Sequence, residues 1–159
     1  MADTASTIPA TLRATAARYP DQDALVDGAV RFSYRELDLA VIDTVRGLVA
    51  MGVSPGDRVA VWAQNCWQWC VACLGVAAAG AVLVPINTRF RGKEAAYLVD
   101  NSEAVALFTT TGFLDADYPG MLRAAAPRHS RLPVVVMDGD VLLEAPALGD
   151  GARGALWQR

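Results

Sequence analysis

The sequence has little lysine, histidine and cysteine, and these scarcities limit the chemistry it can carry. Lys93 is the single lysine and His129 the single histidine, whereas there are thirteen arginines. Any reaction that needs a lysine ammonium group therefore has one possible donor in this chain. Three cysteines are too few, and odd in number, for a disulfide scaffold. This cysteine usage indicates a reducing compartment, and we expect a cytoplasmic protein.

Excess basic charge and a targeting segment are also lacking. The net charge of −3 argues against general attraction to the phosphates of nucleic acid. The first four residues, Met1 to Thr4, include no basic stretch that leads into an apolar run, so no secretory signal is expected. A hydrophobic content of 53% excludes an intrinsically disordered chain, and 159 residues suit one domain.

The longest stretch without charge runs from Val59 to Thr88. A membrane-spanning helix needs only about 20 apolar residues, so such a span is one interpretation. Polar side chains in the first half, and Gly75, Gly80 and Pro85 in the second, argue against it. Buried strands of a parallel sheet also form continuous apolar runs. We therefore favour a buried strand–helix–strand unit and expect no membrane span.

Apolar periodicity and turn residues predict alternating strands and helices along the rest of the chain. The order implies an α/β fold with a mostly parallel sheet and helices on its faces. Helices are expected over residues 7–19, 33–51, 65–79, 92–100 and 118–126, strands over 58–63, 81–84, 105–109 and 133–137, and a hairpin over 23–32.

Two helix starts have recognisable caps. Ser33 and Glu36 have the spacing of a capping box, in which the serine hydroxyl accepts an amide hydrogen and the glutamate reaches back. Asn65 and Gln68 have the same spacing at the next helix, so Asn65 is predicted to cap it.

Three further clusters have both a functional and a structural interpretation. Cys66, Cys70 and Cys73 have the spacing of an iron–sulfur motif, but in a helix they form one packed face, which we favour. The segment 109–112, Thr-Thr-Thr-Gly, is similar to a phosphate loop but has one glycine and no lysine, so a strand end is favoured. Three tryptophans near residues 62–69 could line a pocket, although core packing is the default.

Basic residues gather in two places. Arg89, Arg91 and Lys93 lie at the start of a helix, where cations are mildly unfavourable, so they could meet an anion or form a solvated patch. His129 lies among arginines with no carboxylate at a fixed spacing, and we expect a surface residue. No catalytic triad, metal cluster or carboxylate pair stands out.

The ordered series of segments resembles the opening of the AMP-forming acyl-CoA synthetases, an adenylate-forming, AMP-binding superfamily. The matching segments, in order, are Arg31-Phe-Ser-Tyr-Arg-Glu-Leu37, Gly52-Val-Ser-Pro-Gly-Asp-Arg-Val-Ala60, Cys73-Leu-Gly-Val-Ala-Ala-Ala-Gly-Ala81, Val84-Pro-Ile-Asn-Thr-Arg89 and Glu94-Ala-Ala-Tyr-Leu-Val-Asp-Asn-Ser102. The resemblance covers about residues 8 to 137 and is nearest to ligases of fatty-acid and steroid breakdown.

The resemblance implies that residues 1–137 belong to the large N-terminal domain of an adenylate-forming enzyme. Residues 138–159 would be a loop or tail toward the family's phosphate loop. The family uses ATP, Mg and coenzyme A (CoA) to convert a carboxylic acid to an acyl-CoA through an acyl-adenylate. Its principal catalytic residues match no position here, so no catalytic or metal-binding residue is carried over. Asn87 and Arg89 are carried over as residues of a loop on the acyl and CoA side, although a loop-fixing Asn and a surface Arg are equally acceptable.

Two hypotheses about function follow. The first is an N-terminal fragment of an acid–CoA ligase, inactive alone and with no tightly bound cofactor. Whether the chain itself is an enzyme is left open. The alternative is a stand-alone interaction module that associates with itself, a synthetase or a complementary chain through an incomplete sheet. The sequence does not identify the acyl substrate.

Overall fold

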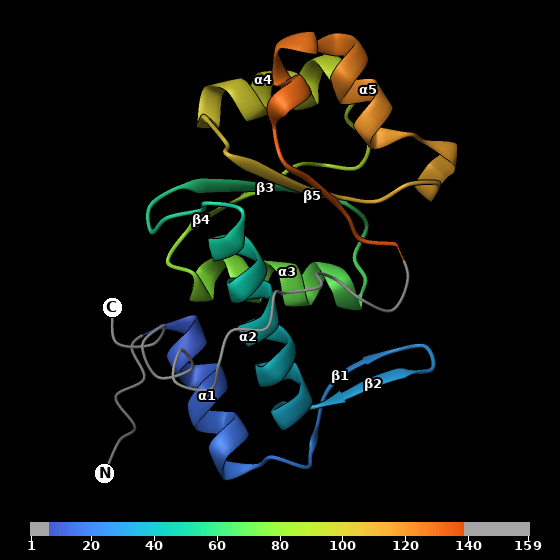
Figure 1. Cartoon of the computed structure of the whole chain (residues 1–159). Helices are drawn as coiled ribbons and strands as arrows, with labels where there is room; N and C mark the ends of the chain where they lie inside the picture. Colours follow the sequence, from blue (N-terminus) through green and yellow to red (C-terminus); the bar gives the residue numbers. More distant parts are fainter. Residues whose placement is uncertain (1–6, 139–159) are drawn as a thin grey trace.

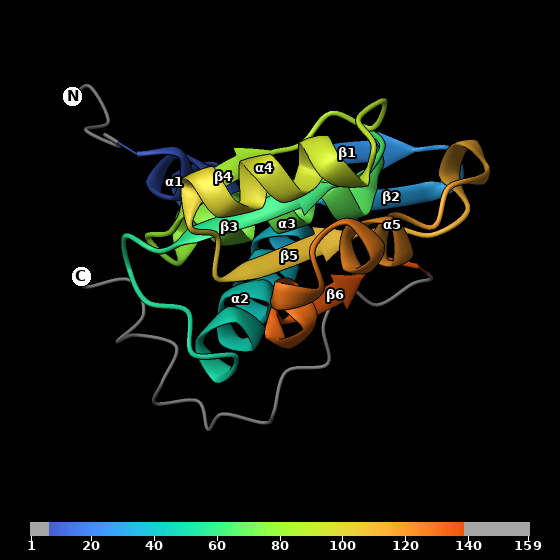
Figure 2. The ribbon, with the colours of Figure 1, turned by 90° about the horizontal axis from the view of Figure 1, so that it is seen from above.

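A parallel sheet of four strands forms the centre of the molecule in the computed structural model, which describes residues 7–138 (Figure 1). The strands are β3 (Arg58–Trp62), β4 (Val82–Pro85), β5 (Ala106–Thr109) and β6 (Val134–Val136). Their order across the sheet is β4-β3-β5-β6, and every neighbouring pair is parallel. Seen from above, β5 lies between β3 and β6 (Figure 2).

Helices cover both faces of this sheet. Helices α1 (Ile8–Arg18), α2 (Tyr34–Ala50) and α3 (Trp67–Ala78) lie on one side, and α4 (Gly92–Ser102) and α5 (Tyr118–Ala125) lie on the other (Figure 1). Two short 3₁₀ helices, η1 (Phe113–Asp115) and η2 (Pro127–Arg131), flank α5. The predicted α/β class is confirmed.

The charge-free run of the sequence forms the middle of this architecture, β3–α3–β4. Alternate residues of β3 point to opposite layers: Val59 and Val61 pack toward α2 and α3, whereas Ala60 and Trp62 pack toward α4 and α5. Both faces of the strand are covered, which explains its continuous apolar sequence. Within residues 7–138, no helix is long and apolar enough to cross a membrane.

Helix α2 begins as predicted. The Ser33 hydroxyl accepts a hydrogen bond from the Glu36 amide, and the Glu36 carboxylate accepts the Ser33 amide hydrogen at 2.8 Å. These hydrogen bonds from Ser33 hold the pKa of Glu36 below its ordinary value. The helix packs closely on α3 because Gly75 has no side chain: a Cβ at this position would lie 2.3 Å from the Thr44 methyl carbon.

The cap of α3 differs from the prediction. Cys66, not Asn65, is the N-cap residue, and no side-chain hydrogen bond from it caps the helix. The Trp67 amide instead donates to the Asp27 carboxylate at 2.9 Å. Asp27 is part of the hairpin of β1 (Asp23–Asp27) and β2 (Val30–Ser33), which the Phe32–Trp67 ring contact joins to α3. The hydrogen-bond acceptor at the start of α3 therefore comes from the hairpin, through tertiary packing. Asn65 does not cap the helix.

Candidate functional site

The described chain has a cleft at the carboxyl ends of β3, β4 and β5. The chain leaves β3 toward α3 on one face and leaves β4 toward α4 on the other, so their loops diverge. In open α/β sheets such a divergence produces a crevice where ligands bind. The cleft encloses about 680 Å³ and is lined by Ala63, Gln64, Asn65, Trp69, Pro85, Ile86, Asn87, Thr88 and Phe113.

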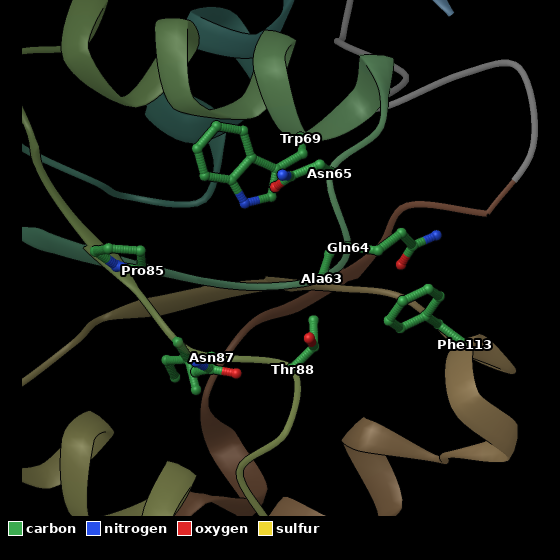
Figure 3. A pocket seen from close by; sticks show the side chains of 9 residues that line it. Ala63, Gln64, Asn65, Trp69, Pro85, Asn87, Thr88 and Phe113 are labelled. Atoms are coloured by element: carbon green, nitrogen blue, oxygen red, sulfur yellow. The ribbon is translucent and has the colours of Figure 1, made fainter. Parts of the chain in front are cut away.

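The lining side chains come from opposite walls. Trp69 and Asn65 lie on the α3 side, facing Asn87 and Thr88 across the cleft, and Phe113 lies at one end (Figure 3). Trp69 therefore has the pocket-wall role that was the less favoured interpretation of the tryptophans. Trp62 and Trp67 are buried in the core, as the default predicted.

No charged residue is among those that line the cleft. Its polar groups are amides, a hydroxyl and the indole N–H of Trp69, set among aromatic and aliphatic side chains. The Gln64 side-chain oxygen is buried and accepts no hydrogen bond from any residue of the described range 7–138. A buried acceptor without a partner costs about 1–3 kcal/mol. The cleft thus suits a neutral ligand that carries amide groups.

The two residues proposed from the sequence lie on the loop after β4 but differ in position. Asn87 lines the cleft, and its side-chain oxygen accepts the Arg89 amide hydrogen at 2.9 Å. This contact makes Asn87 a loop-fixing residue. Arg89 is exposed, outside the lining, and its guanidinium has no hydrogen-bond or ion-pair partner among residues 7–138.

Buried aromatic residues support the same loop from beneath. The Trp62 indole N–H donates to the Asn87 carbonyl at 3.0 Å, and the Tyr118 hydroxyl donates to the Thr88 carbonyl at 3.0 Å. The two rings are in contact, with centroids 4.6 Å apart. Sequence analysis did not anticipate this arrangement, because its partners are 25 and 30 residues apart.

The loop after β5 is held differently. Strand β5 ends at Thr109, which fits a strand end and not a phosphate loop. The Thr110 hydroxyl and the Thr111 amide and hydroxyl donate to the Asp138 carboxylate. Partial burial raises the pKa of Asp138, but these threonine hydrogen bonds outweigh it, and the pKa lies below its ordinary value. These donors are thus already engaged by a carboxylate of the chain.

Strained backbone follows this loop. Leu114 and Asp115 both have φ of 55°, in the left-handed region that residues other than glycine seldom adopt. Such strain tends to accumulate beside binding sites. Here it lies directly after Phe113, the aromatic side chain at the end of the cleft. The sequence contains no glycine or asparagine at these positions that could have indicated the strain.

The cysteine cluster behaves as packed thiols. All three cysteines are free and half-buried, and Cys66 precedes the helix that was expected to contain it. Burial raises the pKa of each thiol, that of Cys73 to about 12. Metal clusters need thiolates, which such pKa values disfavour at neutral pH. Among residues 7–138, no group of three potential metal ligands comes together.

The expectation for His129 was wrong. Its Nε2 atom lies 2.7 Å from an Asp100 carboxylate oxygen, and only 17% of its side chain is exposed. Arg128 donates to the same carboxylate, and hydrogen bonding to Arg128 holds the pKa of Asp100 below its ordinary value. The partners are 28 residues apart, so fixed spacing could not reveal them. The cluster joins α4 to η2 and lies outside the cleft lining.

Comparisons with known proteins point to one family. The chain matches the AMP-binding enzyme family over residues 12–156. A Mycobacterium tuberculosis relative, named as a 7a-methyl-1,5-dioxo-octahydro-1H-inden-4-yl propanoyl:CoA ligase, is 43% identical over 96% of this chain and 31% of its own length. The Rhodococcus jostii ligase of the same name is 38% identical over 86% of this chain and 26% of its own length.

Solved structures agree. A Mycobacterium tuberculosis fatty acyl CoA synthetase superposes with a TM-score of 0.75 and 26% identity. The match covers 90% of this chain and 30% of that protein. The present chain therefore spans between 26% and 31% of the length of these proteins.

Proposed function

Because the chain belongs to the AMP-binding enzyme family, we propose that it forms the N-terminal part of an ATP-dependent acid–CoA ligase. Such an enzyme activates a carboxylic acid with ATP, giving an acyl-adenylate and pyrophosphate, and the CoA thiol then displaces AMP. Adenylation makes the carboxyl carbon electrophilic, so the two steps together form the thioester.

The cleft contributes the CoA side of this reaction. The observation that carries the proposal is the uncharged lining of the cleft, together with the exposed Arg89 on the same loop as Asn87 and Thr88. The Arg89 guanidinium has no hydrogen-bond or ion-pair partner among residues 7–138. CoA combines a neutral arm that contains two amide groups with a phosphorylated nucleotide. The arm suits the cleft, and the phosphates suit the guanidinium of Arg89 on the loop that lines it. Asn87 orients the Arg89 amide and so positions the loop.

The described residues fit ATP and Mg poorly. They bring together no set of carboxylates for a metal ion, and Lys93, the single lysine, does not line the cleft. We therefore assign no adenylation step to this part of the chain, and expect the 159-residue chain to have no ligase activity. A pyrophosphate-release assay with ATP, acyl acids and CoA tests this, and enzyme-dependent turnover would contradict it.

Weak CoA binding is the positive expectation. Titration of the ¹⁵N-labelled chain with CoA should shift the amide resonances of the cleft loops, with millimolar affinity. Arg89→Gln should weaken binding at least about tenfold, because a charge-assisted hydrogen bond contributes about 1.5–3 kcal/mol. Arg123→Gln, an exposed arginine on α5, is the matched control and should leave affinity unchanged. Equal affinities for wild type and Arg89→Gln would remove Arg89 from the site.

The acid is proposed to be bulky and alicyclic. The two relatives at 43% and 38% identity are both named for a propanoyl group on a reduced, methylated indene ring system. This substrate class is tested by a competition assay on the complete acid–CoA ligase to which we propose that the chain belongs. A fused-ring propanoate would compete against a straight-chain fatty acid. A preference for the straight chain would contradict it.

Association through the sheet edge is the second candidate function. Strand β6 pairs only with β5 among the described residues, and its Val134 and Val136 are 37% and 42% exposed. An exposed apolar edge strand favours pairing with another chain. Size-exclusion chromatography with light scattering distinguishes the candidates, since a monomer at all concentrations argues against self-association.

A further inference from the structure

We infer that Trp62 and Tyr118 are positioning residues, which set the loop at residues 86–89 in its ligand-binding shape without contacting the ligand themselves. The inference rests on the proposed CoA role of the cleft for the identity of the ligand. Its structural basis, the attachment of the loop to two buried aromatic side chains, is independent of that identity.

Both side chains are fully buried, with 0% exposure, although each has a polar hydrogen that needs an acceptor. The acceptors are the carbonyl groups of two successive loop residues, Asn87 and Thr88. A surface loop usually directs such carbonyls toward water. Here they point into the protein, toward a tryptophan from β3 and a tyrosine from α5.

Fixing two successive carbonyls fixes the two peptide planes that follow them. The backbone has only two soft torsions per residue, so little freedom is left at Thr88. The Asn87 carbonyl also accepts the Phe90 amide hydrogen at 3.0 Å, which closes the turn. The direction of the Asn87 side chain and of the Arg89 backbone therefore depends on the two aromatic donors.

Trp62 also connects this loop to the neighbouring strand. Its own carbonyl accepts the Thr109 hydroxyl hydrogen at 2.9 Å, in a buried position. Thr109 is the last residue of β5, and Trp62 the last of β3. One tryptophan thus links the ends of two strands to the loop that follows a third. This linkage makes the cleft rim a preformed unit, which lowers the entropy a ligand must lose on binding.

Two variants remove the hydrogen bonds and keep an aromatic ring at each position. Tyr118→Phe removes one hydroxyl, and Trp62→Phe removes the indole N–H with part of the ring. Tyr34→Phe and Trp67→Phe are the matched controls, because both residues pack in the core on the opposite face of the sheet. Far-ultraviolet circular dichroism and urea unfolding identify any variant that fails to fold.

The first readout is amide hydrogen exchange in the whole chain, without ligand. We expect the Arg89 and Phe90 amides to exchange at least about fivefold faster in Tyr118→Phe and Trp62→Phe than in wild type, since a hydrogen bond contributes about 1 kcal/mol. They should be unchanged in the two controls. Exchange at these amides equal to wild type in Tyr118→Phe would overturn the inference, whether or not CoA binds.

The second readout is the CoA dissociation constant, from chemical-shift titration with CoA itself. It should rise about fivefold in both variants and stay at the wild-type value in both controls. Faster loop exchange with unchanged CoA affinity would overturn the positioning role while leaving CoA binding intact. Absence of CoA binding in the wild type, with faster exchange in the variants, would instead contradict the proposed function and support the attachment.

Discussion

Two loops at the same edge of the sheet are fixed by opposite means. The loop after β4 is attached from below, by indole and phenol hydrogens of fully buried side chains. The loop after β5 is attached by an exposed carboxylate, Asp138, through the hydroxyls of Thr110 and Thr111. The first attachment has no group that titrates near neutral or acid pH, whereas the second depends on ionisation. The loop after β4, which we propose to contact CoA, is therefore attached by groups that do not respond to pH in this range.

Removing the buried Trp62 side chain should lower the free energy of unfolding the most. Trp62→Ala deletes a fully buried indole, and such truncations cost about 3–5 kcal/mol in the free energy of unfolding. Urea unfolding measures this cost. Trp69→Ala removes the half-buried indole of the cleft wall and should cost less. Equal costs would show that Trp62 is not the anchor we describe.

Breaking the Thr109–Trp62 hydrogen bond between β5 and β3 should lower the free energy of unfolding by an intermediate amount. Thr109→Val keeps the shape but loses the buried hydroxyl that donates to the Trp62 carbonyl. We expect a loss of about 1 kcal/mol in the free energy of unfolding, with altered amide resonances in both loops. Thr109→Ser retains the hydroxyl and should keep wild-type resonances in the 86–89 loop. Changes confined to the β5 loop would mean that the two loops are not coupled.

Loss of the exposed attachment should have the smallest effect on stability. Asp138→Asn should cost less than about 1 kcal/mol, as is usual for exposed charged contacts. The pKa of Asp138 is lower in the folded chain than the ordinary value of 3.8 for an aspartate. Its stabilising contribution is therefore present above pH 3.8 and lost as the pH falls through the lowered, folded pKa.

The pH dependence separates the two loops directly. Between pH 5 and about 2, the Thr111 amide resonance should shift in wild type and stay constant in Asp138→Asn. The Arg89 amide should not follow the same titration. A common midpoint for both amides would contradict independent attachment.

Local sequence predicted the elements well because their determinants lie within a few residues. The Ser33–Glu36 box and the turn at Gly28 are complete in the sequence, and both appear in the structure. The predictions failed where a partner comes from another element. Asp27 replaces Asn65 as the partner at the start of α3, and Asp100 pairs with His129.

The cleft was foreseen only in part for the same reason. Asn87 was identified from the resemblance, and it does line the cleft. Gln64 and Phe113 were not proposed as site residues, and a pocket role for Trp69 was the less favoured interpretation, because periodicity indicates which side of an element is apolar but not which loops meet. The boundary expected at residue 138 cannot be compared with the fold, since residues 139–159 lie outside the described range.

The central claim is that the cleft receives CoA, and a CoA titration followed by ¹H–¹⁵N spectra of the wild-type chain tests it most directly. The account predicts shifts that cluster at Gln64, Asn65, Asn87, Thr88 and Phe113, saturate in the millimolar range and are absent with AMP. Shifts spread over the α1–α2 face, or no shifts at saturating CoA, would contradict it.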